Sequence, residues 1–224
     1  MRSRVPELIL SAAALVAPLA VGAQPYKDAR LSAEIRVTDL LGRMTLEEKF
    51  WQLYMIPGSL DDTAANYSRG VFGLQNRSAA EARADAEVHN AMQRYVAERT
   101  RLGIPMLNFE EAVHGLMRRG ATVFPAAIAL AASWDTALVG RVATAIARET
   151  RSRGVRQVLS PVVNIATDSR WGRVEETYGE DPFLSSAMGR VYVRAFEERG
   201  IVATPKHFVA NVGDGGRDSY PIDV

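Results

Sequence analysis

The chain has 224 residues, of which 47% are hydrophobic and 24% charged, a balance that indicates a globular domain with a sizeable core and excludes a disordered tail. Its 27 basic and 26 acidic residues leave a formal net charge of +1, so no overall charge attracts it to nucleic acid or to an anionic membrane. The sequence contains no cysteine, which excludes disulfide bonds and lipids attached through sulfur. Partners must therefore be inferred from local patterns, and no nucleic acid is expected among them.

Residues 1–23 have the pattern of a secretory signal peptide. Two arginines precede an apolar stretch from Ile9 to Val21, and Val21 and Ala23 stand at the third and first positions before a cleavage site. The alternative is a permanent membrane anchor, against which Pro18 interrupts a stretch already short for a bilayer. We predict cleavage after Ala23, no stable membrane anchor, and export to a bacterial periplasm or out of the cell, as the lack of cysteine also favours.

Two short helices are predicted at the start of the mature chain. Ser32 can cap a helix within residues 31–44, and Thr45 can cap a second helix within residues 45–53. Glu48 stands three residues after Thr45, which predicts a capping box. We interpret both helices as a segment that leads into the main domain.

Short apolar runs then alternate with long amphipathic stretches. The predicted strands lie within residues 70–75, 104–109, 157–165 and 201–208, and the predicted helices within residues 78–101, 135–154 and 181–200. Strands without in-and-out alternation, each followed by a helix, predict a parallel sheet covered by helices.

Two architectures fit such a sheet. A doubly wound nucleotide-binding sheet is disfavoured, because the sequence has no G-x-G-x-x-G and no G-x-x-x-x-G-K-S/T. Three successive predicted strands end in polar clusters, "NFEEAVHG", "NIATDSRWGR" and "PKHFVAN". Because functional groups of a (β/α)8 barrel lie at the C-terminal ends of its strands, these clusters predict one shared site. We predict an α/β, TIM-type barrel domain of which residues 24–224 form the N-terminal part, with four to five strand-helix units.

Each cluster also has a structural interpretation. Glu110 and Glu111 could be acids in the first turn of a helix. Arg173 could belong to an ion-pair network with the acidic residues that follow it, and Lys206 with His207 could be a solvated pair in a loop. Together, however, the clusters supply one carboxylate, one guanidinium, one ammonium and one imidazole. That combination suits sugar hydroxyls, because charged hydrogen bonds are the strong ones.

A metal site is the competing interpretation of the polar clusters. The three histidines are His89, His114 and His207, and none lies in an H-x-x-x-H or H-E-x-x-H arrangement. We therefore expect no metal and no cofactor, and a structural role for His114.

Five motifs together carry a resemblance to a known family. From about residue 36 to the end, the chain resembles the N-terminal barrel domain of glycoside hydrolase family 3, the β-glucosidases and β-xylosidases, in the stretches "RMTLEEKFWQL", "IPMLNFEEAVHG", "ATVFPAAIALAASWD", "DSRWGRVEETYGEDP" and "TPKHFVAN". The resemblance implies that Glu111, Arg173, Lys206 and His207 bind the sugar next to the cleaved bond. These are the residue types that the strand ends indicate.

Two details refine the resemblance. Ser169 stands where the family more commonly has proline, a change that we expect to be tolerated. The sequence "KHFVAN" resembles the glucosidase and xylosidase branch, not the "KHFPG" of the N-acetylhexosaminidase branch. The implied substrate is a β-linked oligosaccharide or glycoside, namely a β-glucoside or a β-xyloside.

The resemblance also implies a retaining mechanism, which uses two carboxyl groups about 5 to 5.5 Å apart. In the family, both lie beyond the "KHF" motif, so no catalytic residue is assigned here, and Asp214, Asp218 and Asp223 follow Lys206 too closely. A complete barrel takes roughly 250 residues. We therefore expect a fragment of an exported glycoside hydrolase that is inactive in isolation. The alternatives are a sugar-binding remnant without catalysis, and an unrelated barrel that binds another polyol or anion.

Overall fold

The computed structural model describes residues 24–60, 67–76, 81–209 and 211. The chain divides into two compact units, residues 1–44 and residues 45–224. The predicted signal peptide and the three aspartates Asp214, Asp218 and Asp223 lie outside the described residues. Among the described residues, every helix is too short or too polar to cross a bilayer.

The first unit contains a 3-10 helix, η1 (Pro25–Lys27), and the helix α1 (Ala33–Arg43). Ser32 caps α1 as predicted, since its side chain accepts a hydrogen bond from the backbone three residues later. The backbone N–H of Tyr26 donates to Asp39 at 3.1 Å, and Arg36 donates to the carbonyl of Tyr26 at 3.0 Å. These contacts bind η1 to α1.

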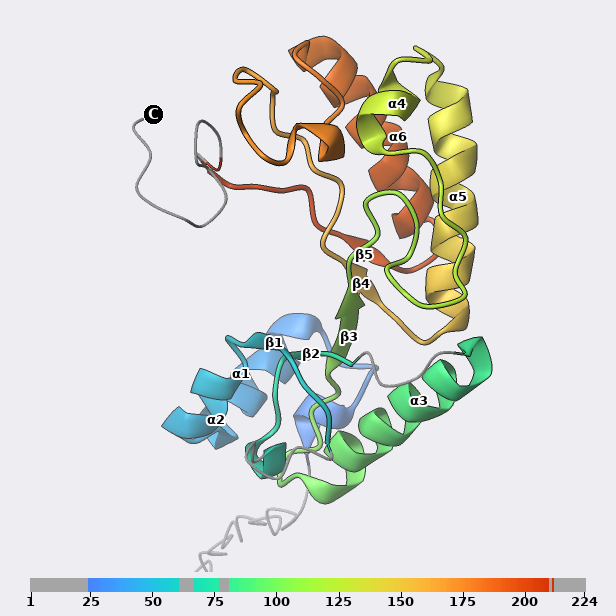
Figure 1. Ribbon diagram of the computed structural model, residues 1–224. Coiled ribbons are helices and arrows are strands. Elements are labelled where there is room, and N and C mark those ends of the chain that lie inside the picture. Colours follow the sequence, from blue (N-terminus) through green and yellow to red (C-terminus); the bar gives the residue numbers. More distant parts are fainter. Residues whose placement is uncertain (1–23, 61–66, 77–80, 210, 212–224) are drawn as a thin grey trace, which may run out of the picture. The chain divides into compact units, whose positions relative to one another are not determined.

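Within its described residues, the second unit contains five strands connected by helices (Figure 1). The strands are β1 (Met55–Pro57), β2 (Gly73–Gln75), β3 (Leu107–Glu110), β4 (Gln157–Val158) and β5 (Val202–Ala203). The helices are α2 (Leu46–Trp51), η2 (Tyr67–Arg69), α3 (Ala82–Arg99), α4 (Ala127–Ala131), α5 (Thr136–Ser152), η3 (Val174–Glu176) and α6 (Pro182–Glu197).

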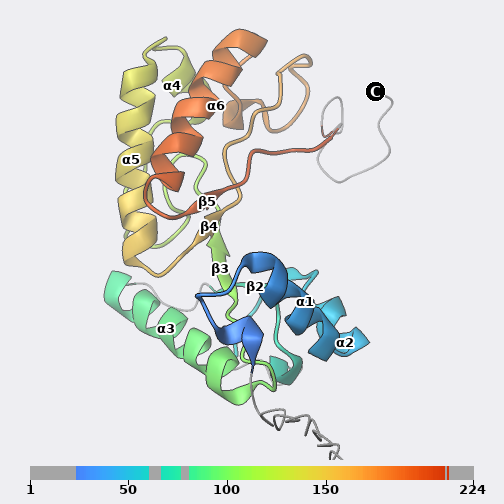
Figure 2. The ribbon, with the colours of Figure 1, turned by 180° about the vertical axis from the view of Figure 1, so that it is seen from behind.

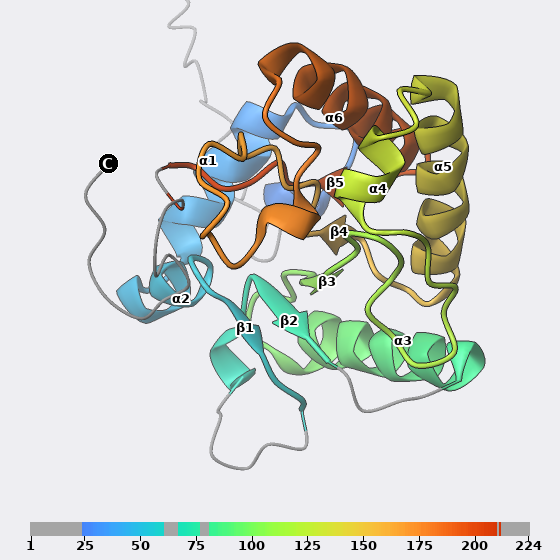
Figure 3. The same ribbon diagram turned by 45° about the horizontal axis from the view of Figure 1, so that its top comes forward.

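All five strands are parallel and pair in the order in which they follow one another in the sequence. A doubly wound sheet reverses its strand order at a switch point, whereas a TIM-type barrel adds strands consecutively. The strand order therefore confirms the barrel interpretation. Figure 3 shows α3, α5 and α6 on the same face of the curved row of strands, as expected for consecutive right-handed strand-helix units.

Apolar contacts hold the helices on the strands. On β2, Leu74 is fully buried in a cluster with Met92 and Val96 of α3. On β4, Val158 packs in a second cluster with Ile146 of α5 and Phe196 of α6. Helices α5 and α6 lie side by side, as Figures 1 and 2 show from opposite directions. This packing fixes β3, β4 and β5 as a rigid base for the loops at their ends.

The predicted capping box at the start of α2 is confirmed. The side chain of Thr45 accepts from the backbone N–H of Glu48 at 3.2 Å, and the carboxylate of Glu48 accepts from the backbone N–H of Thr45 at 2.8 Å. Arg101 also binds this carboxylate, with contacts of 2.9 and 2.5 Å. The hydrogen bond from Arg101 is the main reason that the pKa of Glu48 lies below its usual value.

Three features differ from the sequence-based expectation. The structure adds β1, which follows α2 so closely and is so short that no strand periodicity is visible in the sequence. It also adds α4, a helix of five residues without a side-chain cap. The remaining strands are shorter than the apolar runs that predict them, and β4 and β5 have two residues each.

Candidate functional site

The C-terminal ends of β3, β4 and β5 bring the three predicted polar clusters together. The three strands are neighbours in the sheet. Beyond β4 and β5 the chain stays parallel, because Val162 pairs with Lys206, and the N–H of Val163 donates to the carbonyl of Lys206 at 2.8 Å. Glu111 directly follows β3. The predicted shared edge therefore exists.

Glu111 and Lys206 form an ion pair at this edge. The ammonium nitrogen of Lys206 lies 2.8 Å from one carboxylate oxygen of Glu111 and 3.0 Å from the other. The side chains are 28% and 16% exposed, so the pair is shielded but accessible. An ionised carboxylate has about four acceptor positions and an ammonium has three donors. The pair can therefore bind hydroxyl groups without first separating.

Arg173 lies between an acid and an imidazole. Its guanidinium binds Glu176 through two hydrogen bonds of 2.6 Å each. A third nitrogen of the guanidinium lies 2.9 Å from Nε2 of His207. The ion-pair interpretation of Arg173 is thus correct in that it pairs with Glu176, and the same side chain also joins the cluster. Such a bidentate pair holds the guanidinium plane in a fixed orientation.

The hydrogen bonds of His207 assign the position of its proton. Oδ1 of Asn164 accepts from the backbone N–H of His207 at 3.0 Å, so this atom is an acceptor. The same oxygen lies 2.9 Å from Nδ1 of His207, which must therefore carry a hydrogen. Nε2 faces the cationic donor Arg173 and so acts as the acceptor. The ring of His207 is neutral and supports Arg173.

A cavity of about 260 Å³ opens beside this cluster. Its lining consists of Glu111, Val113, His114, Met117, Arg173, Glu175 and Glu176. Two of the four predicted residues thus line the cavity, and each of the other two binds one of them. Nδ1 of His114 lies 3.2 Å from the carbonyl of Phe124. This contact fits the structural role expected for His114, although its side chain also faces the cavity.

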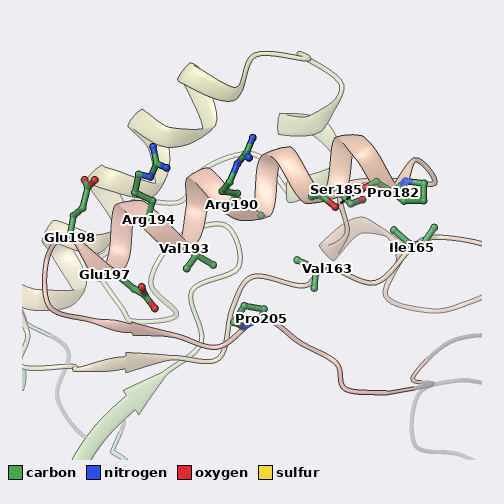
Figure 4. Close-up of a pocket in the computed structure, with 12 residues that line it drawn as sticks. Val163, Ile165, Pro182, Ser185, Arg190, Val193, Arg194, Glu197, Glu198 and Pro205 are labelled. Atoms are coloured by element: carbon green, nitrogen blue, oxygen red, sulfur yellow. Dashed lines mark hydrogen bonds between the residues drawn. The ribbon is translucent and has the colours of Figure 1, made fainter.

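A larger cavity of about 670 Å³ lies elsewhere, between α6 and the segments that follow β4 and β5 (Figure 4). Its apolar part includes Val163, Val193 and Pro205, and its charged residues come from α6 and from Glu198, which directly follows α6. None of the four predicted residues lines it. A sugar site requires polar groups that converge on the ligand, so the smaller cavity is the candidate functional site.

The loop that begins at Glu111 is held firmly at its base. The backbone N–H of Ala112 donates to the hydroxyl of Ser160 at 3.1 Å, and the hydroxyl of Tyr192 donates to the carbonyl of Ala112 at 2.5 Å. Tyr192 is buried, and burial raises its pKa well above the usual value. The tyrosine therefore remains a neutral donor that supports the loop.

The structure contradicts one interpretation of the two acids at the end of β3. No helix begins at Glu110 or Glu111, and the next described helix, α4, starts only at Ala127. Glu110 is the last residue of β3 and is fully buried. The interpretation of both acids as first-turn residues of a helix is wrong, because the strand runs to Glu110 and an irregular loop follows.

Arg170 and Arg173 have separate environments. Arg170 binds Asp168 at 2.7 Å, and its side chain is 66% exposed. The hydrogen bond from Arg170 is the main reason that the pKa of Asp168 falls to about 2. Of these two arginines, the candidate site therefore uses Arg173, the one that the family resemblance selects.

Sequence reasoning missed Asn164 and gave Glu176 no role other than an ion pair. Asn164 is the first residue of the cluster "NIATDSRWGR" that follows β4. The rule that polar residues at strand ends form the site would have selected it. Arg173 directly precedes η3 and Glu176 is its last residue, so their contact depends on a short element that the sequence did not predict.

Comparisons with known proteins bear on the family and the fold of the chain. Residues 45–223 match the glycosyl hydrolase family 3 N-terminal domain. The chain is 32% identical over 192 residues to a β-xylosidase of Formosa agariphila, with 72% of the chain and 25% of that protein covered. It is 32% identical over 229 residues to a periplasmic β-glucosidase/β-xylosidase of Dickeya chrysanthemi, with 88% and 35% covered. A solved β-glucosidase from Erythrobacter marinus superposes with a TM-score of 0.77 at 35% identity, over 87% of the chain and 28% of that protein.

Proposed function

The chain belongs to glycoside hydrolase family 3, and on that premise we propose that it supplies the sugar-binding part of an exported, retaining β-glycosidase. The observation that carries the proposal is the contact of Glu111 with Lys206 and of Arg173 with His207 at one edge of a parallel sheet. The chain spans about a quarter of the length of the β-xylosidase that it resembles. The proposed reaction therefore belongs to the longer protein.

Glu111 is proposed to accept hydrogen bonds from two neighbouring sugar hydroxyls. Lys206, already bound to both oxygens of this carboxylate, would donate to one of the same hydroxyls. Arg173 would donate to a third, while Glu176 and the neutral ring of His207 hold its guanidinium in place. Charged groups fixed before the ligand arrives lose little entropy on binding, which favours affinity for a polar ligand.

The substrate class follows from the relatives. They are named as a β-xylosidase, a β-glucosidase, and a protein with both activities, so we propose β-glucosides or β-xylosides as substrates. Export is supported by the signal-peptide pattern of residues 1–23 and by the periplasmic relative. We place the nucleophile and the acid/base outside these 224 residues, as the family resemblance implies.

The proposal is tested by hydrolysis of 4-nitrophenyl β-D-glucopyranoside and 4-nitrophenyl β-D-xylopyranoside. The full chain is compared with the same chain extended through its downstream reading frame. We expect hydrolysis only by the extended form, with the first product observed by NMR as the β-anomer. Hydrolysis by the 224-residue chain would contradict the placement of the catalytic carboxylates. Sugar binding without hydrolysis by either form would favour the non-catalytic alternative.

A further inference from the structure

Four charged side chains are buried beside the end of β3, apart from the residues that line either cavity. Asp85 lies on α3, Glu110 ends β3, Arg118 lies in the loop after β3, and Arg153 follows α5. None of these residues is more than 8% exposed. Two acids and two bases balance in charge, as buried groups require. Because burying charges is an expensive way to stabilise a core, their contacts are informative about their role.

Arg118 and Arg153 connect the loop after β3 to its surroundings. Nε of Arg118 lies 3.3 Å from Oε2 of Glu110 and 3.6 Å from Oδ2 of Asp85. Nη1 of Arg153 lies 3.3 Å from the same oxygen of Asp85, and its Nη2 donates to the carbonyl of Arg119 at 3.2 Å. Two guanidinium groups thus anchor the loop to β3, to α3 and to the end of α5.

The other oxygen of Glu110 reaches the candidate site. Oε1 accepts a hydrogen bond from the backbone N–H of Glu111 at 3.2 Å and another from Nε2 of Gln75 at 2.5 Å. One carboxylate therefore holds Arg118 with one oxygen. With the other oxygen it holds the peptide group from which the side chain of Glu111 projects. A charged acceptor makes such bonds stronger than a neutral acceptor would.

We infer that Glu110 and Arg118 are positioning residues for Glu111, and that the buried pair fixes the backbone of Glu111 so that its carboxylate meets Lys206 and the sugar. The sugar-binding part of this inference rests on the proposed function. A group that must meet two hydroxyls at once needs supporting contacts that lock its geometry. If the pair served only to hold the core together, its loss would lower stability without a selective effect on the segment around Glu111.

Three variants of the full chain separate these roles. Glu110→Gln preserves the shape and one acceptor oxygen but removes the charge that holds Arg118. Glu48→Gln is the matched control, because Glu48 is also buried and also binds an arginine and a backbone N–H, yet lies on α2 and does not line the cavity. Gln75→Ala is a milder change that removes one neutral donor to Glu110 and leaves the ion pair in place.

The first readout is amide hydrogen exchange of the segment 109–118, which needs no sugar. We expect exchange at least tenfold faster in Glu110→Gln, a smaller increase in Gln75→Ala, and no change in Glu48→Gln. The second readout is the Kd for methyl β-D-glucopyranoside. It should rise at least tenfold in Glu110→Gln, less in Gln75→Ala, and not at all in Glu48→Gln.

Two results would overturn the inference. One is an amide exchange rate in the segment 109–118 that is the same in Glu110→Gln as in Glu48→Gln. The other is an exchange rate in Glu110→Gln that rises evenly over the whole chain. If Glu110→Gln does not fold, the same comparison between Gln75→Ala and Glu48→Gln decides. A wild-type chain that binds no sugar would contradict the proposed function alone, because the exchange data would still decide whether Glu110 positions Glu111.

Discussion

Two charged clusters meet at the end of β3, and they differ in what surrounds them. On the accessible side, Glu111 pairs with Lys206, and their side chains are 28% and 16% exposed. On the buried side, Glu110 pairs with Arg118, and their side chains are 0% and 2% exposed. The two acids are consecutive in the sequence, and the end of a strand sends neighbouring side chains to opposite sides.

Consecutive acids can thus have separate roles, one available to a ligand and the other stabilising the fold. An accessible ion pair keeps acceptor and donor positions that a sugar can use, and it contributes less to stability than a buried pair because water reaches it. A buried pair offers nothing to a ligand, but the loss of one partner leaves an uncompensated charge in the core. Variants of the buried cluster should therefore lower stability and weaken binding through Glu111, whereas variants of the accessible cluster should weaken binding and leave stability nearly unchanged.

The largest expected effect is on stability, from the buried cluster. Arg118→Met removes the charge that faces both Glu110 and Asp85. We expect the free energy of unfolding to fall by about 3–5 kcal/mol, because Glu110 loses a buried cationic partner and Asp85 keeps only Arg153. Urea denaturation followed by circular dichroism measures the change. The control is Arg170→Met, which removes an exposed arginine and should leave the unfolding free energy nearly unchanged. Equal losses of unfolding free energy in the two variants would contradict the predicted difference between the buried and the exposed arginine.

The second effect is on binding, from the accessible cluster. Glu111→Ala removes the acceptor proposed to bind two hydroxyls. The loss of charged hydrogen bonds should weaken binding of methyl β-D-glucopyranoside by about 1.5–3 kcal/mol, or roughly 10- to 150-fold in Kd. The free energy of unfolding should change little, because Lys206 can be solvated. Calorimetric titration measures the Kd, with Glu198→Ala, an exposed residue that directly follows α6, as the control. An unchanged Kd would remove Glu111 from the site.

The accessible cluster could be predicted from the sequence to a greater extent than the buried one. Glu111, Arg173, Lys206 and His207 stand in the polar clusters that end or follow apolar runs, and parallel strands gather their ends at one edge. The capping box of Thr45 and Glu48 is equally local, since three residues separate the partners. Such features depend on spacing along the chain, which the sequence displays.

The pairing of Arg118 with Asp85 could not be predicted. The two residues are 33 positions apart (118 − 85 = 33) and lie on different elements, so their contact depends on how α3 packs beside β3. The proton position of His207 likewise depends on Asn164, which lies 43 residues earlier in the sequence. The strand β1 was missed because three residues carry no periodicity. Tertiary packing selects these partners, and a single sequence does not display it.

A smaller effect on binding is expected from Asn164. Asn164→Leu removes the acceptor that fixes His207, so the imidazole can rotate away from Arg173. The loss of one neutral supporting hydrogen bond should raise the Kd by about fivefold, or about 1 kcal/mol. Asn164→Asp retains an acceptor oxygen and should lie closer to the wild type in the same titration. A Kd in Asn164→Leu equal to that of the wild type would mean that His207 needs no support.

The smallest effect concerns the pH dependence of stability. Burial lowers the pKa of His89 below its usual 6.5, and Nδ1 lies 2.7 Å from the carbonyl of Arg153, to which it donates. The unfolded chain then takes up a proton at a higher pH than the folded chain does. The free energy of unfolding should therefore fall as the pH drops below 6.5, until the folded-state pKa is reached. Urea denaturation between pH 7.5 and about 5.5 should show a shallower slope in His89→Phe than in the wild type. Equal slopes would contradict the role of His89.

The most direct test of the proposed sugar site is an NMR titration of the full chain with methyl β-D-glucopyranoside and methyl β-D-xylopyranoside, in the wild type and in Glu111→Ala. The indole of Trp171 is a convenient probe, because its ring lies edge-on to His207 with centroids 6.5 Å apart. We predict saturable shifts of the Trp171 indole and of residues 111–117, which are lost in Glu111→Ala. Shifts confined to the cavity beside α6, or equal binding by both proteins, would contradict the assignment of the sugar site.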